Sequence, residues 1–225
     1  WGQEGQQQEV TPETSQVAEE SIPISATQQE SFRDTKVPDA SPVGVGESFE
    51  LTPTQKEYFK DTTVVDDKGD PLVVYHGTDK TFTKFEDSPA SEGSAKEMGS
   101  GFYFTPDPEE ASSYAEGSGG RVVPVYLNIK NPWLSYRTPK WSKESWDYIK
   151  QKFDSEISDR TSQMYKDEKI EKLKDGNMYT MHQFLGADGI REALKLSGYD
   201  GIQDGQYRIA FNPEQIKSVF NQKPA

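Results

Sequence analysis

The sequence predicts an α+β fold with mainly antiparallel sheets. Two observations support this prediction: the β-prone runs are short and bounded by Gly, Pro and Asp, and residues 142 to about 196 have a mostly helical pattern. Short strands that are interrupted by helices are typical of the α+β class. No internal repeat is visible along the chain.

Residues 1–45 are expected to form a disordered, acidic and polar linker. They are rich in Gln, Glu, Ser, Thr and Pro, and their apolar residues are isolated, with no sustained strand or helix period. They offer too little apolar surface to offset an ordering cost of ~1–2 kcal/mol per residue. The chain begins with Trp, and no signal-peptide pattern follows it. We therefore expect a processed product, or a C-terminal piece of a polypeptide with a further domain upstream.

Residues 46–225 are expected to form the folded domain, which opens with a helix and a hairpin. Thr52 and Pro53, followed by residues 54–60, predict a short capped helix with Pro53 at its first position. Gly and Asp residues at 66–70 separate two β-prone runs, 64–65 and 72–75, and predict a hairpin.

The middle of this domain is expected to contain two strands around a short helix. A β-prone run over 101–105 precedes a helix over 108–115, for which Asp107 is the expected N-cap. A longer strand is predicted over 121–129, and Pro124 within it indicates an edge strand or a bulge.

A helical insertion is predicted at about 140–197. Within it Ile149, Phe153 and Ile157 recur every four residues and form one apolar stripe. Gly198 is expected to end the last helix in the left-handed conformation. The chain is then expected to continue through the short strand-like segments 199–202, 206–211 and 213–219.

The composition disfavours several kinds of site. The chain has no Cys, which excludes disulfides, thiol nucleophiles and Cys-based zinc sites, and with two His we expect no metal site. No apolar run approaches the roughly 20 residues of a membrane span, so a soluble protein is expected. The formal net charge of −13 argues against a basic groove that follows nucleic-acid phosphates.

Three separated segments contain side chains suited to chemistry. His76 ends a predicted strand, Tyr103 lies in the next strand with Tyr114 eleven positions later, and Gln206 begins the penultimate strand. Each residue taken singly has a structural explanation, as a satisfied His, core aromatics, or a solvent-facing polar residue. Their combination and order are more specific.

Together, these segments resemble the diphtheria-toxin and poly-ADP-ribose-polymerase class of ADP-ribosyltransferases, whose members have His, Tyr and Glu on three strands. The chain is similar in particular to the ADP-ribosyltransferase domains of phage polyvalent proteins and related bacterial toxins. The resemblance covers nearly all of residues 57–219. The matching segments are 71–78, Phe82 with Phe85, 101–105, 125–132, 198–202 and 211–218.

The resemblance implies an ADP-ribosyltransferase fold, with two packed sheets around an NAD cleft. It implies NAD as co-substrate, with no metal. The implied catalytic residues are His76, Tyr103 and Gln206, and the implied NAD-binding residues are His76, Gly77, Thr78, Tyr103 and Tyr114.

The residue types suit the cleavage of NAD. The two tyrosine rings could hold the flat nicotinamide ring between them. Gly77 has no Cβ and permits close approach of the backbone to the carboxamide. The resemblance implies that His76 forms a hydrogen bond with a ribose hydroxyl. A carboxylate should stabilise the ribosyl cation that develops when nicotinamide leaves.

Gln206 departs from the family pattern, because the catalytic Glu is expected at this position. A Gln amide keeps a hydrogen bond to a ribose hydroxyl but cannot supply negative charge. Three explanations remain open: the domain works with Gln, it is silenced but still binds NAD, or Asp204 or Glu214 replaces the missing acid.

The expected function is mono-ADP-ribosylation of a macromolecule, with a protein acceptor favoured because Lys and Arg are not clustered. The domain would belong to a phage- or bacterium-derived effector or toxin that acts in a cytoplasm, with an immunity protein as a candidate partner. Alternatives are an NAD glycohydrolase and a non-catalytic NAD-binding or interaction module. An RNA 2′-phosphotransferase is a weaker alternative, because it requires a basic cluster.

Further residues have a functional and a structural interpretation. Arg121 and Arg137 could contact the NAD pyrophosphate, although surface positions are favoured. Residues 88–100 form either a lid over NAD or an ordinary loop. His182 is expected to be structural. Packing roles are expected for Trp133, Trp141 and Trp146.

Overall fold

The structure is a computed structural model, and its described residues are 50–80, 84–86, 98–116, 120–221 and 224. All of them belong to one compact unit, residues 38–225. The expected linker at 1–45 and most of the expected lid at 88–100 lie outside the described residues.

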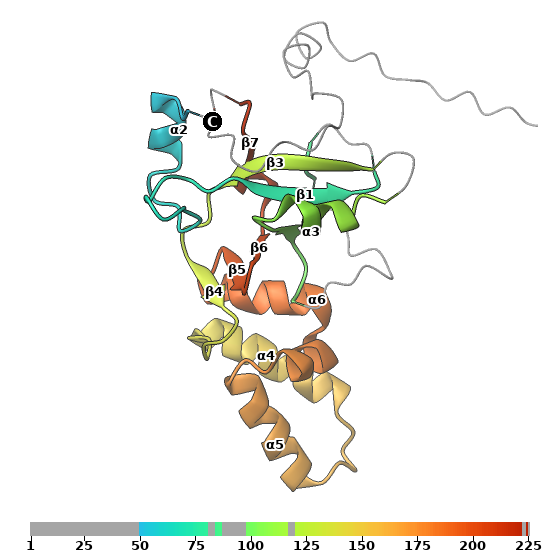
Figure 1. Cartoon of the computed structure of the whole chain (residues 1–225). Helices are drawn as coiled ribbons and strands as arrows, with labels where there is room; N and C mark the ends of the chain where they lie inside the picture. The colour runs from blue at the N-terminus through green and yellow to red at the C-terminus, as the bar shows by residue number, and fades with distance from the viewer. Residues whose placement is uncertain (1–49, 81–83, 87–97, 117–119, 222–223, 225) are drawn as a thin grey trace, which may run out of the picture. The chain divides into compact units, whose positions relative to one another are not determined.

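The first sheet has three strands in the order β1 (Val74–Thr78), β3 (Arg121–Leu127) and β7 (Ile216–Ser218), and both of its pairings are antiparallel (Figure 1). The second sheet has four strands in the order β2 (Phe102–Phe104), β6 (Tyr207–Ala210), β5 (Gly201–Asp204) and β4 (Pro132–Leu134). Its pairings are antiparallel except between β4 and β5. The predicted α+β fold with mainly antiparallel sheets is confirmed.

The two sheets meet at Tyr75 and Thr105. The Tyr75 N–H donates to the Thr105 carbonyl over 2.7 Å, and the Thr105 N–H returns a bond of 3.1 Å to the Tyr75 carbonyl. Tyr75 lies in β1 and Thr105 directly follows β2. This junction brings the end of β1, with His76, beside the strand that contains Tyr103.

Both predicted short helices are present. Helix α2 (Pro53–Tyr58) begins at Thr52, whose side chain forms a capping box with Gln55. Helix α3 (Pro108–Ser113) begins at Asp107, whose carboxylate accepts the backbone N–H groups of the first turn.

The predicted hairpin is present at its turn. Val65 and Pro71 form an antiparallel bridge, the Asp66 N–H donates to the Asp70 carbonyl over 2.8 Å, and the Leu72 N–H donates to the Val64 carbonyl over 3.0 Å. From Val74 the second run continues as β1, which pairs with β3. Local turn chemistry does not reveal this second partner, which is distant in sequence.

Pro124 lies in the central strand of its sheet, so the predicted edge or bulge is wrong. It is opposite Tyr75, whose own N–H and carbonyl are bonded to Thr105. On its other side the Val219 N–H reaches the Pro124 carbonyl over 3.5 Å. Pro124 has no N–H that could donate to the Val219 carbonyl, and this carbonyl accepts a hydrogen bond from the Gln55 side-chain amide instead. The buried Gln55 side chain therefore replaces the missing backbone donor.

The helical insertion consists of α4 (Lys143–Glu156), α5 (Gln163–Lys174) and α6 (Met178–Leu196), between β4 and β5. The predicted apolar stripe is confirmed, because Ile149 and Phe153 are almost fully buried and Ile157 packs beside them. The three Trp residues also contribute to this core, with Trp133 buried and Trp141 and Trp146 against it.

Helix α6 is interrupted at Gly186, where φ is 65° and ψ is 176°. It ends at Gly198, as predicted, with a φ of 83°. The Tyr199 N–H then donates to the Leu194 carbonyl over 3.1 Å and the Gly198 N–H to the Lys195 carbonyl over 2.9 Å. These two bonds form a Schellman motif.

No helix within the described ranges combines the length and the apolar character that crossing a membrane requires.

Candidate active site

His76 is held at the junction of the two sheets. Its Nδ1 donates to the Tyr103 carbonyl over 2.9 Å, and its ring packs against Phe85 and Phe104 at centroid distances of 5.3 and 5.5 Å. Because a carbonyl only accepts hydrogen bonds, Nδ1 carries the proton of the neutral ring and Nε2 is the acceptor. Burial lowers the pKa of His76 below 6.5, against a smaller opposing effect of the hydrogen bond to Tyr103.

Tyr103 is fixed at its hydroxyl group. The hydroxyl donates to the Gly99 carbonyl over 2.6 Å and accepts the Met98 N–H over 3.3 Å. Its ring packs against the core of the helical insertion. The tyrosine is therefore held by the segment just before its own strand.

That segment is in turn fastened to α6 of the insertion. The Ser100 N–H donates to the Ala187 carbonyl over 2.9 Å, and the Ser100 hydroxyl bonds the Asp188 carboxylate. Ala187 directly follows the break at Gly186. The insertion thus helps to position Tyr103.

Gly77 is the point where α3 approaches β1. A Cβ on Gly77 would lie 1.7 Å from the Ala111 carbonyl oxygen and 3.1 Å from the Tyr114 Cβ. Only Gly permits this approach, which is a second reason for Gly here besides access to a ligand. Thr78, the last residue of β1, accepts the Lys80 N–H at its hydroxyl over 3.1 Å.

Tyr114 is at the C-terminal cap of α3, and its side chain is 59% exposed. The approach of α3 to Gly77 brings Tyr114 to the end of β1 that contains His76. Gly77 and Tyr114 are therefore neighbours, although 37 positions of sequence (114 minus 77) separate them.

Gln206 is not in a strand, in contrast to the prediction. Asp204 in β5 pairs with Tyr207 in β6, which leaves Gly205 and Gln206 as an exposed two-residue turn. Gly205 has a φ of 51°, as such a tight turn requires. The Arg208 guanidinium stabilises this turn by donating to the Gly205 carbonyl over 2.9 Å.

The two acids considered as replacements have other surroundings. Asp204 accepts a hydrogen bond from the Ser135 hydroxyl at the second sheet. Glu214 is exposed beyond the opposite end of β6, and its carbonyl binds the Tyr58 hydroxyl over 2.8 Å.

Glu110 is not among the residues predicted from the sequence, but it contacts Tyr207 beside Gln206. The Tyr207 hydroxyl donates to its carboxylate, across 97 positions of sequence. The pKa of Tyr207 is raised to about 12, first by Glu110, next by Tyr114, while Gln206 acts in the opposite direction. The signal in the sequence was the spacing, since Glu110 precedes Tyr114 by four residues on one helix and shares its face.

The remaining candidates lie apart from this cluster or beside it. Arg121 is opposite Thr78 in β3, at the same end of the first sheet. Arg137 is exposed beside β4, with its guanidinium 5.6 Å from the centre of the Tyr136 ring. His182 is a half-buried residue of α6.

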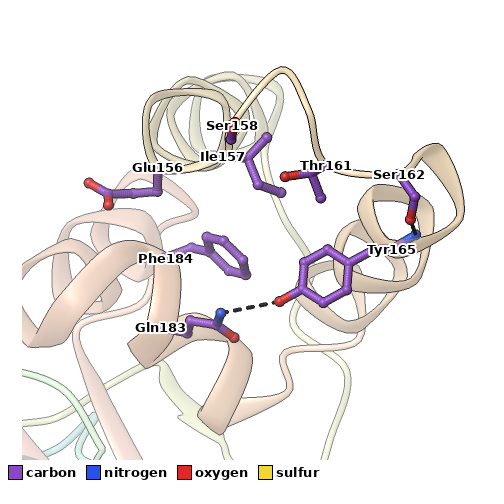
Figure 2. Close-up of a pocket in the computed structure, with 8 residues that line it drawn as sticks. All are labelled: Glu156, Ile157, Ser158, Thr161, Ser162, Tyr165, Gln183 and Phe184. Atoms are coloured by element: carbon purple, nitrogen blue, oxygen red, sulfur yellow. Dashed lines mark hydrogen bonds between the residues drawn. The ribbon is translucent and has the colours of Figure 1, made fainter.

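A cavity of about 530 Å³ is present on the helical insertion (Figure 2). The Tyr165 hydroxyl and the Gln183 amide meet across it at 3.4 Å. Its lining contains none of the predicted site residues: it consists of Glu156, Ile157, Ser158, Thr161, Ser162, Tyr165, Gln183 and Phe184. Among the described residues, no group of three or more His, Cys, Asp or Glu could hold a metal ion.

A family comparison agrees with this arrangement. The family model described as ADP-ribosyltransferase in polyvalent proteins matches residues 66–225. That range includes both sheets, α3, the helical insertion and every site residue named above. No curated protein and no solved structure shows a significant match to the chain. Because the family model covers well over half of the sequence, the chain belongs to the family of ADP-ribosyltransferases in polyvalent proteins.

Proposed function

We propose that residues 46–225 form an NAD-dependent mono-ADP-ribosyltransferase that modifies a macromolecule, in preference a protein, and releases nicotinamide. Family membership supports ADP-ribosyl transfer in general. The observation that supports NAD as the donor is the arrangement at the end of β1, where His76, Gly77 and Tyr114 lie together.

In this reaction the bond between C1′ of the nicotinamide ribose and the nicotinamide nitrogen breaks. Its electron pair stays on the nitrogen, so nicotinamide leaves as a neutral molecule. Positive charge develops on C1′ and the ribose ring oxygen. An oxygen or nitrogen of the acceptor then bonds to C1′ and releases its proton to solvent.

His76 is suited to orient the ribose. With Nδ1 committed to the Tyr103 carbonyl, the neutral ring presents Nε2 as an acceptor for a ribose hydroxyl. The lowered pKa keeps the ring neutral at pH 7, so it would not repel the developing cation. The ring is also held firmly, since Phe85 and Phe104 pack against it.

Gly77, Thr78 and the two tyrosines are suited to hold nicotinamide. The backbone at Gly77 has no side chain to obstruct the carboxamide. Tyr114 keeps 59% of its surface exposed, so its ring face is accessible for stacking. Tyr103 would contribute the second aromatic surface, with its hydroxyl anchored on Gly99.

Gln206 supports a second candidate function, an NAD-binding or interaction module without turnover. The Gln amide can bond a ribose hydroxyl. Because it is uncharged, it cannot stabilise the ribosyl cation as a carboxylate does, and the rate of NAD cleavage is lower as a result. An NAD glycohydrolase, with water as the acceptor, is the related alternative. The presence of such domains in polyvalent proteins supports an effector of phage or bacterial origin that acts in a cytoplasm. A disordered linker at 1–45, an upstream domain and an immunity protein belong to the same proposal.

Titration calorimetry with NAD, together with an assay of nicotinamide release, tests the proposed function. We expect saturable binding, and we expect Tyr114→Ala to weaken it roughly 5-fold to 150-fold through lost stacking of ~1–3 kcal/mol. Tyr136→Ala is the matched control, because Tyr136 is also an exposed tyrosine, at 70%, but lies beside β4. Absence of binding at millimolar NAD would overturn the proposal. Binding without release would favour the module without turnover.

A further inference from the structure

We propose that the Glu110 carboxylate supplies the negative charge at the ribosyl cation that the Gln206 amide cannot supply. The inference rests on the proposed function, because it assigns a catalytic residue to the same NAD site. Glu110 would act as a fixed charge: it forms no bond to the sugar and exchanges no proton. The departing nicotinamide still takes the electron pair of the broken bond, and the acceptor still releases its proton to solvent.

The first argument is the position of α3. Glu110 and Tyr114 are four residues apart, so they share one face of the helix end. That end is pressed against β1 at Gly77, where a Cβ would meet the Ala111 carbonyl at 1.7 Å. The helix therefore cannot present Tyr114 to the nicotinamide site without also bringing Glu110 close to it.

The second argument is the contact between Glu110 and β6. The Tyr207 hydroxyl donates directly to the Glu110 carboxylate. Tyr207 directly follows Gln206, the position at which the family pattern has its acid. The carboxylate therefore reaches the start of β6 from a different element. One accepted hydrogen bond leaves the carboxylate with further acceptor capacity for a ribose hydroxyl.

The raised pKa of Tyr207 agrees with a hydroxyl group that stays protonated beside Glu110. This pKa is raised to about 12, with the hydrogen bond to Glu110 as the largest cause. A phenolate beside a carboxylate is disfavoured, so Tyr207 stays protonated and continues to donate. Glu110 is half-buried, which allows both this contact and access to a ligand.

The other nearby acids fit less well. Asp204 is bonded to the Ser135 hydroxyl, and Glu214 lies beyond the far end of β6. Glu109 precedes Glu110 on the same helix, but it is exposed. Glu109 is therefore a matched control for a change of charge on α3.

The test compares Glu110→Gln with Glu109→Gln in the full chain. We expect Glu110→Gln to lower the rate of nicotinamide release roughly 100-fold, with the Kd for NAD changed less than about 3-fold. Glu109→Gln should leave both quantities within about 2-fold of the unmodified chain. Gln retains an acceptor for the Tyr207 hydroxyl, so folding should be preserved, and a thermal unfolding curve checks this.

Restoring charge at the family position gives an independent variant. The double variant Glu110→Gln with Gln206→Glu should recover most of the lost rate, because either carboxylate places charge near the start of β6. Failure of this rescue, with NAD binding intact, would argue against charge as the missing element.

A cycle with Tyr207→Phe distinguishes a catalytic charge from a residue that only positions Tyr207. If Glu110 acts through its charge, Glu110→Gln should remain roughly as harmful in the Tyr207→Phe background. If Glu110 acts only through the hydrogen bond, the second change should add nothing, and the inference is overturned.

The outcomes separate this inference from the proposed function. If the unmodified chain does not bind NAD, the proposed function fails and the inference fails with it. If the unmodified chain binds NAD and releases nicotinamide, but Glu110→Gln does so at the same rate, only the inference fails. If the unmodified chain binds NAD without release, Glu110 does not supply the catalytic charge and the inference is likewise overturned.

Discussion

The helical insertion and the candidate active site are assembled by different kinds of contact. The insertion is held by apolar side chains at helical spacing, and Ile149, Phe153 and Ile190 are at most 1% exposed. The active site is held by individual approaches between distant segments, such as His76 to Tyr103 and Tyr207 to Glu110.

This difference separates stability from geometry. In the insertion many apolar contacts contribute to stability. Loss of one large side chain therefore lowers the free energy of unfolding but leaves the other side chains in place. At the site, one backbone approach or one hydrogen bond determines where a catalytic group lies. The two regions are connected at Ser100, whose hydrogen bonds to α6 hold the segment before Tyr103.

The largest effect on stability is expected in the insertion. Phe153→Ala removes a ring that packs against Phe184 at a centroid distance of 4.8 Å, and it should lower the free energy of unfolding by ~3–5 kcal/mol. Urea denaturation measures this loss. The NAD affinity of the folded fraction should stay within about 2-fold. Met164→Ala in α5, at a side chain that is 82% exposed, should have little effect on either quantity.

A smaller loss of stability with a larger loss of function is expected at Gly77. Gly77→Ala forces α3 away from β1, because the new Cβ would meet the Ala111 carbonyl at 1.7 Å. We expect a cost of ~1–3 kcal/mol, typical of overpacking, together with loss of measurable NAD binding. Calorimetry and denaturation on one sample check both. Gly69→Ala, in an open turn with a φ of 86°, tests the backbone cost alone and should leave NAD binding intact.

A more modest effect is expected where the two regions meet. Ser100→Ala removes the hydroxyl that bonds Asp188 and should cost about 1 kcal/mol of stability. Because the same segment anchors the Tyr103 hydroxyl, NAD affinity should also fall a few-fold. Ser155→Ala in α4, whose hydroxyl bonds only within its own helix, is the control. Equal NAD affinity in both variants would mean that the hydrogen bond between Ser100 and Asp188 does not position Tyr103.

The smallest effect is expected from His76 and depends on pH. The folded-state pKa lies below the unfolded value of 6.5, so the folded state binds the proton less readily. Above that value the ring is neutral in both states and contributes no pH dependence. As pH falls through 6.5 the unfolded state takes up the proton first, so stability declines down to the folded-state pKa. His76→Asn should remove this component from a series of unfolding curves, and His182→Asn should retain it.

Local elements and the family were accessible from the sequence. Pro53, Asp107 and Gly198 marked helix ends through short-range hydrogen bonding and backbone preference, and these positions are confirmed. The stripe that contains Ile149 and Phe153 predicted the main helix of the insertion. Such features depend on neighbours a few residues apart, so the sequence determines them by itself.

Only the tertiary structure decided the contacts between distant segments. The run at 72–75 begins in the local hairpin and then pairs with β3, a partner that is distant in sequence. Gln206 was predicted in a strand but lies in a turn, because the pairing of Asp204 with Tyr207 leaves Gly205 and Gln206 to reverse the chain. Glu110 came to contact Tyr207, and α3 packs closely against β1 at Gly77. Each of these contacts depends on which surfaces pack together in the folded chain. The local sequence does not determine that packing.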